Sequence, residues 1–190
     1  MTVYLIRHGQ TQGNLERRYI GSTDQPLCPA GREALGPLPP VDRVYASPLR
    51  RCRETAALLY PGAAVEIVPD FRECGFGAFE MKTYEELRDD GAYQAWLDTG
   101  GVSAPPGGES KDSFQWRTVA AFHRLAASWG EEGSAALVVH GGTIMALLEA
   151  LEPSHDFYRW QAANGRGFRC RWAEGALSVD APWPRICPHP

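Results

Sequence analysis

Two histidines follow short apolar stretches that lie far apart in the chain. Residues 3–6 lead directly into Arg7 and His8, and residues 136–139 lead into His140. Both stretches have the length and apolar character of buried strands. Because parallel strands of an α/β sheet end at the same edge, we expect the two imidazoles and the Arg7 guanidinium to lie together there. Such an edge would bind an anion, and a neutral histidine in it could attack phosphorus.

Phosphoryl transfer is the chemistry that suits this set of groups. Its transition state spreads negative charge over three equatorial oxygens, which the planar fork of an arginine can bind in pairs. A histidine nucleophile must be neutral, with its second ring nitrogen donating to a carbonyl that fixes the tautomer. Gly141 follows the second histidine, and without a side chain it lets the backbone approach a phosphate closely.

Two further segments could supply a second cation and an acid. Ser47 and Pro48 predict the start of a helix, with the serine as N-cap, and this helix carries Arg51. Glu73 lies in a loop-like segment among apolar rings, where burial would raise its pKa. Such a carboxyl could protonate a leaving alcohol and later deprotonate water. A surface carboxylate paired with Arg72 is the alternative interpretation of Glu73.

Strands and helices alternate along the sequence, which is typical of an α/β sandwich with a mostly parallel sheet. We predict a single domain, residues 1–190, in which the glycine-rich and aromatic residues 71–112 form an insertion covering the sheet edge. The prolines from residue 182 onward predict an irregular tail. Strands are predicted at residues 2–6, 43–46, 65–68, 136–139, 168–172 and 176–179, and helices near Pro29 and Ser47, over residues 110–129, and from Thr143.

Composition excludes several classes of function. The net charge of −4 gives no general attraction for nucleic acid or an acidic membrane surface. Five scattered cysteines without a C-x-x-C spacing indicate neither a zinc site nor a disulfide framework. No apolar run approaches the roughly 18–20 residues that span a bilayer, and the N-terminus shows no secretion signal, so we expect a cytoplasmic protein. No cluster has metal-ligand spacing, so we expect a reaction without metal or cofactor.

Taken together, six ordered segments resemble the histidine phosphatase superfamily, the phosphoglycerate mutase-like proteins. The resemblance implies a three-layer α/β/α sandwich in which His8 becomes phosphohistidine and Glu73 is the proton donor. It also implies that Arg7, Arg51 and His140 hold the phosphoryl oxygens. Asn14 would assist them, with helix capping as the alternative. The matching segments are residues 5–11 with Asn14, 21–31, 47–51 with Thr55 and Ala56, 72–80, 106–110 and 138–142.

Within the superfamily the chain is similar to the small α-ribazole phosphatase-like members. Mutases carry a longer insertion with extra arginines, whereas residues 81–109 contain only Lys82 and Arg88 as cations. The resemblance therefore implies a phosphomonoesterase acting on a small phosphorylated metabolite, as a monomer or homodimer, without nucleic-acid or membrane partners. A phosphoglycerate mutase-type phosphotransferase and a non-catalytic phosphate-binding regulator are the alternatives. Trp96, Trp116 and Tyr93 are candidates for the leaving-group pocket, with packing in the core or lid as the alternative.

Overall fold

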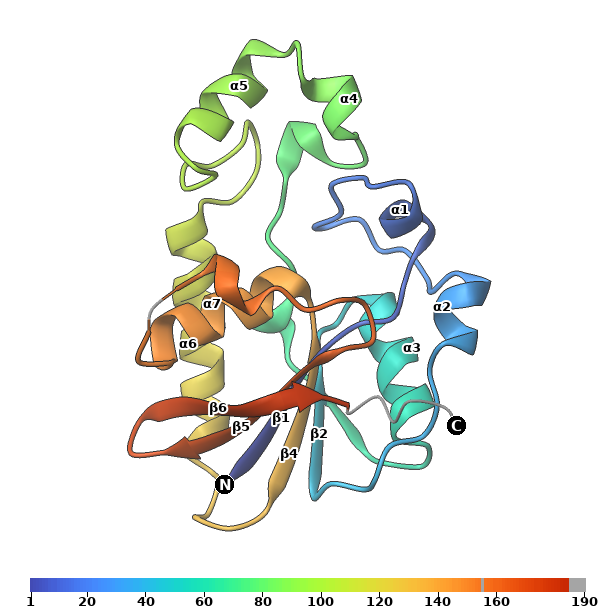
Figure 1. The fold of residues 1–190 in the computed structure, drawn as a ribbon, viewed down its shortest axis with the longest axis vertical. Helices are drawn as coiled ribbons and strands as arrows, with labels where there is room; N and C mark the ends of the chain where they lie inside the picture. Colours follow the sequence, from blue (N-terminus) through green and yellow to red (C-terminus); the bar gives the residue numbers. More distant parts are fainter. Residues whose placement is uncertain (155, 185–190) are drawn as a thin grey trace.

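The computed structural model of the chain describes residues 1–154 and 156–184. Six strands form one sheet in the order β3-β2-β4-β1-β5-β6, and helices cover both of its faces (Figure 1). The first four strands of that order run parallel, and β5 and β6 add an antiparallel hairpin at one side. The predicted α/β sandwich is therefore confirmed. The strands are β1 (Thr2–Arg7), β2 (Arg43–Ala46), β3 (Val65–Ile67), β4 (Ser134–Val139), β5 (Gly167–Ala173) and β6 (Ala176–Trp183).

Successive side chains of the central strands point to opposite faces of the sheet, and they form two separate cores. In β4, Leu137 and Val139 face a core shared with α6 (Lys111–Ala126) and α7 (Gly141–Leu151), whereas Val138 faces a core shared with α3 (Arg50–Leu59). All three side chains are fully buried. Burial of one such side chain stabilises the fold by about 1.5–3 kcal/mol. The strand ends that carry the candidate site are thus anchored on both faces.

Two local predictions are wrong. Helix α3 begins at Arg50 rather than at Ser47, and its N-cap, Leu49, makes no side-chain capping bond. The Ser47 hydroxyl lies against His140 instead, at 2.7 Å. The predicted irregular tail is also wrong at its start, because Pro182 pairs with Phe168 inside β6. Residues 185–190 of that tail lie outside the described part of the chain.

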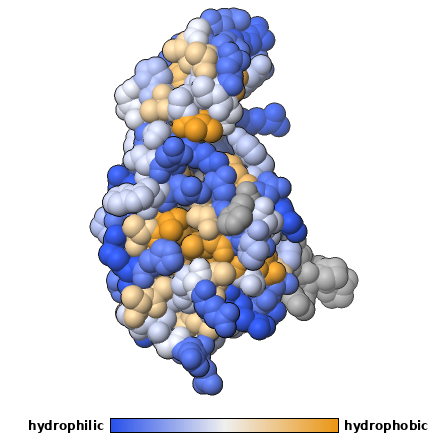
Figure 2. Space-filling view, turned by 90° about the vertical axis from the view of Figure 1, so that its left-hand side faces the viewer, coloured by the Kyte–Doolittle hydropathy of each residue, from blue (hydrophilic) through white to orange (hydrophobic). Residues whose placement is uncertain are grey.

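The segment between β3 and α6 contains short helices beyond the carboxyl ends of the parallel strands (Figure 1). Phe79, Leu87 and Tyr93 form a small buried cluster within it. The labels α4 and α5 stand at the upper end of the molecule in Figure 1, and Figure 2 shows this upper end joined to the body by a narrower waist. The helices near the N-terminus are α1 (Gln12–Leu15) and α2 (Pro29–Glu33). The segment between β3 and α6 contains α4 (Tyr84–Leu87) and α5 (Gly91–Asp98), with 3-10 turns at Pro69–Phe71 and Gly77–Phe79. A further 3-10 turn, Tyr158–Trp160, follows α7.

Across the described residues, none of the helices combines the length and the apolar character that a bilayer crossing requires.

Candidate active site

The two histidines meet at the predicted sheet edge. β1 and β4 pair in parallel with Arg7 opposite Val139, so the next residue of each strand is a histidine. The His8 and His140 ring centroids lie 5.3 Å apart, with the rings inclined at 65°. The spacing of the two apolar stretches therefore predicted the meeting of these side chains correctly.

His8 is held as a neutral imidazole. Its Nδ1 lies 2.7 Å from the carbonyl oxygen of Gly9, so Nδ1–H donates there and Nε2 keeps its lone pair. Burial, and then the charge of Arg51, hold the pKa of His8 well below its ordinary value. The ring lines a small cavity of about 250 Å³ together with Arg7, Asn14, Glu73 and Gly141, among other residues.

His140 is also neutral and is fixed through both ring nitrogens. Arg51 donates from Nε to Nδ1 at 3.3 Å, which makes Nδ1 an acceptor. Nε2–H therefore donates to the Ser47 hydroxyl at 2.7 Å. Burial is the main reason that the pKa of His140 lies well below its usual range, and the charge of Arg51 adds to it. Ser47 follows β2, a parallel neighbour of β4, and this adjacency places it beside His140.

Arg51 is a buried cation held by backbone carbonyls. It donates to the carbonyls of Thr23 at 2.8 Å and of Gly21 at 2.9 Å, and its side chain is 1 % exposed. The Glu80 carboxylate in turn accepts the N–H groups of both loop residues and of Phe76. Together with the Nε bond to His140, the two bonds to carbonyls use three of the five guanidinium N–H donors of Arg51, so two remain for another acceptor.

The four groups do not all line the small cavity. Arg7 and His8 form its wall, whereas Arg51 and His140 lie behind it and contact each other. Arg7 donates from Nη1 to the Ala162 carbonyl at 2.8 Å, and its buried Nε has no partner among the described residues. A donor in such a position is costly unless an acceptor comes to it.

Gly141 stands beside the Arg7 guanidinium at the N-terminus of α7. A β-carbon at this glycine would lie 3.4 Å from Arg7 Nε. The N-cap, His140, makes no side-chain capping bond; of the first two N–H groups of the helix, that of Gly142 is taken by Glu73, and Gly141 lines the small cavity. The glycine therefore keeps space open where an anion would meet both the guanidinium and the helix.

Glu73 faces the same space from the opposite side. Its Oε2 accepts the Gly142 N–H at 3.2 Å, and its Oε1 accepts the Cys74 N–H at 2.9 Å. Burial raises the pKa of this carboxyl, and these N–H groups and Arg51 offset only part of that effect. The surface pair with Arg72 is not formed, because Arg72 pairs with Asp70. The raised pKa predicted from the sequence is confirmed in direction.

Asn14 makes the helix cap that was its alternative interpretation, and it also lies at the small cavity, while its role toward a phosphate stays a prediction. It closes a capping box with Thr11, whose N–H donates to Asn14 Oδ1 at 3.1 Å. Asn164, which belongs to none of the motifs described above, donates to the same oxygen at 3.1 Å. Asn14 also lines the small cavity, and its Nδ2 has no partner within the described ranges.

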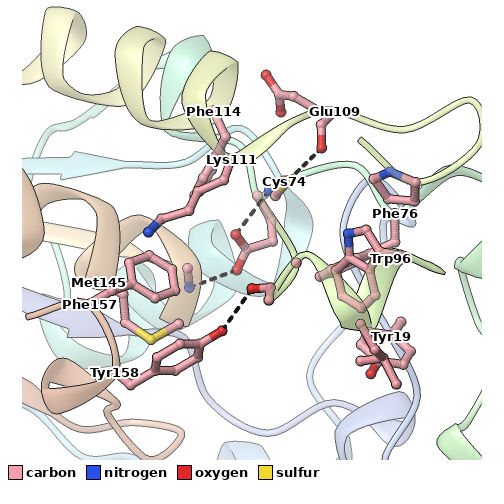
Figure 3. A pocket seen from close by; sticks show the side chains of 16 residues that line it. Tyr19, Cys74, Phe76, Trp96, Glu109, Lys111, Phe114, Met145, Phe157 and Tyr158 are labelled. Atoms are coloured by element: carbon pink, nitrogen blue, oxygen red, sulfur yellow. Dashed lines mark hydrogen bonds between the residues drawn. The ribbon is translucent and has the colours of Figure 1, made fainter. Parts of the chain in front are cut away.

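A larger cavity of about 530 Å³ adjoins the small one, and Glu73 and Phe76 line both. Figure 3 shows that its walls are mostly aromatic and apolar, with Lys111 at one side. Lys111 Nζ pairs with Glu149 at 2.7 Å and lies 4.1 Å from the ring centre of Phe157. Of the three candidates, Trp96 lines this cavity, whereas Trp116 is 75 % exposed on α6 and Tyr93 is buried in the cluster with Phe79 and Leu87. The ring-bearing side chains of the wall are Tyr19, Phe76, Trp96, Phe114, Phe157 and Tyr158.

The described residues contain no group of three or more histidine, cysteine, aspartate or glutamate side chains arranged to hold a metal ion. A reaction without metal stays a prediction, which chelation of the active protein tests.

Known proteins resemble this chain in sequence and in fold. The family described as the histidine phosphatase superfamily (branch 1) matches residues 3–181. An adenosylcobalamin/alpha-ribazole phosphatase of Salmonella typhimurium is 32% identical, over 87% of each chain. A solved structure of a putative alpha-ribazole-5'-P phosphatase from Escherichia coli superposes with a TM-score of 0.84 at 26% identity, covering 95% of this chain and 94% of that one. A phosphoglycerate mutase from Thermus thermophilus gives 0.70 at 34% identity, covering 94% and 97%.

Proposed function

Because the chain belongs to the histidine phosphatase superfamily, we propose that it is a phosphomonoesterase that works through a phosphohistidine at His8. The observation that carries the proposal is a neutral imidazole at the wall of the small cavity, with Nδ1–H on a carbonyl and Nε2 free. Arg7 and Glu73 line the same space. The substrate is a small phosphorylated metabolite, and no metal takes part.

In the first step, His8 Nε2 attacks phosphorus in line as the bond from phosphorus to the ester oxygen breaks. Glu73, whose pKa is raised by burial, gives its proton to the departing oxygen, which leaves as an alcohol. Arg7 Nε and the Gly141 N–H at the start of α7 bind the phosphoryl oxygens, together with the Asn14 amide. These donors oppose the negative charge of the transition state.

In the second step, water replaces the imidazole. The Glu73 carboxylate takes a proton from water as the water oxygen attacks phosphorus, and the bond to His8 Nε2 breaks. Inorganic phosphate forms, His8 returns to its neutral state and Glu73 regains its proton. One carboxyl therefore serves as acid and then as base, which suits its position between the two cavities.

Arg51 and His140 are proposed to complete the phosphate site from behind its wall. Arg51 retains two N–H donors for phosphoryl oxygens, and its charge also keeps His8 unprotonated. His140 accepts from Arg51 and thereby orients it.

The larger cavity is proposed to hold the leaving group. Its aromatic walls fit a flat, uncharged group such as the base of an α-ribazole phosphate, in keeping with the names of the relatives. Among the described lining residues, Lys111 is the single cation, and it is already paired with Glu149. A mutase would need cations for the carboxylate of a phosphoglycerate, so this lining favours the phosphatase. Residues 71–112 are proposed to cover the site, since they contribute Phe76 and Trp96 to this wall.

The test is turnover of p-nitrophenyl phosphate by the wild type and by His8→Ala. We expect wild-type activity that survives a chelator and is blocked by vanadate, and loss of activity in the variant. Activity near wild type in His8→Ala would refute the proposal. Interconversion of phosphoglycerates faster than phosphate release would select the mutase. Phosphate binding without turnover of any ester in a panel that includes α-ribazole phosphate would select the regulator.

A further inference from the structure

Arg117, on α6, is a buried cation outside both cavities, and all five of its N–H donors are used. Nη1 donates to the carbonyls of Asp70 at 2.6 Å and Arg72 at 2.8 Å. Nη2 donates to the carbonyl of Glu73 at 3.1 Å and to Glu109 Oε2 at 2.6 Å. Nε donates to Glu109 Oε1 at 2.7 Å. The residue is 7 % exposed, so its charge is compensated mainly by these partners.

These hydrogen bonds hold in place the backbone segment that carries Glu73, the proposed acid. Residues 72–76 have no helix or strand of their own, so no regular backbone ladder fixes the position of Glu73. Glu109 makes a second contact with this segment, because its N–H donates a hydrogen bond to the Gly75 carbonyl at 2.9 Å. One guanidinium therefore joins α6, the segment before Glu73 and the loop that ends at Glu109.

We propose that Arg117 is a positioning residue for Glu73: its bond to the Glu73 carbonyl keeps the carboxyl against the Gly142 N–H at the cavity wall. This inference rests on the proposed role of Glu73 as the proton donor. A displacement of about 1 Å at a reacting group can cost on the order of a hundredfold in rate. Loss of the five bonds frees the segment, and its carboxyl then turns toward solvent.

The consequence differs between leaving groups. p-Nitrophenolate departs without a proton, whereas the alkoxide of 2-phenylethyl phosphate must be protonated as it leaves. In Arg117→Met we therefore expect about a tenfold or greater loss in the rate of 2-phenylethanol release, and a loss of less than about threefold for p-nitrophenol. The rates are measured in a single turnover with enzyme in excess, which isolates the first step from hydrolysis of the phosphoenzyme.

The pH profile gives a second readout. Burial raises the pKa of Glu73, so a carboxyl released into solvent loses its proton at lower pH. The alkaline limb of 2-phenylethanol release should move to lower pH in Arg117→Met. Arg117→Lys keeps the charge but not the five-donor fork, and we expect an intermediate loss. Arg124→Met is the matched control: this exposed arginine of the same helix pairs with the Asp70 side chain and should leave both rates unchanged.

Equal losses for both esters with an unmoved alkaline limb, or no loss for either, would overturn the inference. If Arg117→Met does not fold, Glu109→Gln takes its place, with the same unequal loss expected and an equal loss again contradicting it. His8→Ala separates the two proposals. If His8→Ala stays active, the proposed function itself fails; if it is inactive and Arg117→Met loses both rates equally, only the positioning role fails.

Discussion

At the scale of single residues, the candidate site depends on two side chains whose pKa values burial shifts in opposite directions. His8 stays neutral because burial and Arg51 disfavour its charged form. Glu73 holds its proton more tightly because burial disfavours the carboxylate. The sequence predicted both residues from their types and their places after strands. Arg117 could not be predicted in this way, since three of its partners are backbone carbonyls, which no residue type reveals.

The pH dependence of turnover follows from these two shifts. His8 must be unprotonated, so the acid limb of kcat/KM lies below the ordinary histidine pKa of about 6.5. Glu73 must be protonated, so the alkaline limb follows its pKa, which lies above the ordinary carboxyl value. We expect a bell-shaped profile for 2-phenylethyl phosphate, and loss of the alkaline limb in Glu73→Gln. An unchanged alkaline limb in the residual activity of that variant would contradict the role of Glu73.

Gly142 gives a second test of the proton donor. A β-carbon at this position would lie 2.4 Å from Glu73 Oε1, so the carboxyl must move in Gly142→Ala. We expect about a tenfold or greater loss of kcat for 2-phenylethyl phosphate. Gly91→Ala is the control, since no atom lies within 4 Å of its added carbon. A crystal structure of Gly142→Ala with Glu73 unmoved, or kcat equal to that of the control, would refute this prediction.

At the scale of elements, strand ends and one loop bring the cations together. The strands were predictable because short apolar stretches bounded by glycine, proline or polar residues carry a local signal. The role of Ser47 was not predictable, because the local Ser-Pro signal for a helix cap competes with a contact to His140, which directly follows the neighbouring strand. The loop at residues 21–23 matched the superfamily in sequence, but only the structure shows that it wraps one carboxylate, Glu80, while its carbonyls bind Arg51.

Glu80→Gln tests this loop as a unit. The amide cannot accept all the N–H and hydroxyl donors of residues 21–23, so some are left without an acceptor. We expect unfolding free energy to fall by about 1–3 kcal/mol and vanadate to bind more weakly, because the carbonyls that hold Arg51 shift. Urea unfolding and vanadate inhibition measure the two effects. Glu66→Gln, on the exposed face of β3, is the control, and equal values for the two variants would contradict the prediction.

At the scale of the whole molecule, the sheet keeps two buried imidazoles neutral, and this links folding to pH. The pKa of His8 and that of His140 are both lowered in the folded state, so the unfolded chain binds more protons between those values and about 6.5. Their contribution to stability is complete above about pH 6.5 and is lost as pH falls through the folded-state values. Glu73 has the opposite effect on stability. Because its pKa is raised in the folded state, the folded chain binds this proton at a higher pH than the unfolded chain does, which stabilises the fold as the pH falls.

Urea unfolding between pH 7.5 and 5.5 should therefore show a smaller pH dependence in His8→Asn than in the wild type. Each unit by which the folded-state pKa is lowered corresponds to about 1.4 kcal/mol of differential stability. The two proteins are compared by the slope of the unfolding free energy against pH rather than by its absolute value, because the substitution also changes packing. Parallel slopes for the two proteins would show that His8 binds protons equally in the folded and unfolded states, so that folding does not lower its pKa.

The most direct measurement is the position of the phosphoryl group during turnover. The enzyme is mixed with a radiolabelled phosphate ester, quenched in alkali, which preserves phosphohistidine, and digested with trypsin. Cleavage after Arg7 and Arg17 yields a peptide of residues 8–17 with one histidine, His8. We expect the label on that peptide and none from His8→Ala. Label on any other peptide, or no label while phosphate release continues, would contradict the account.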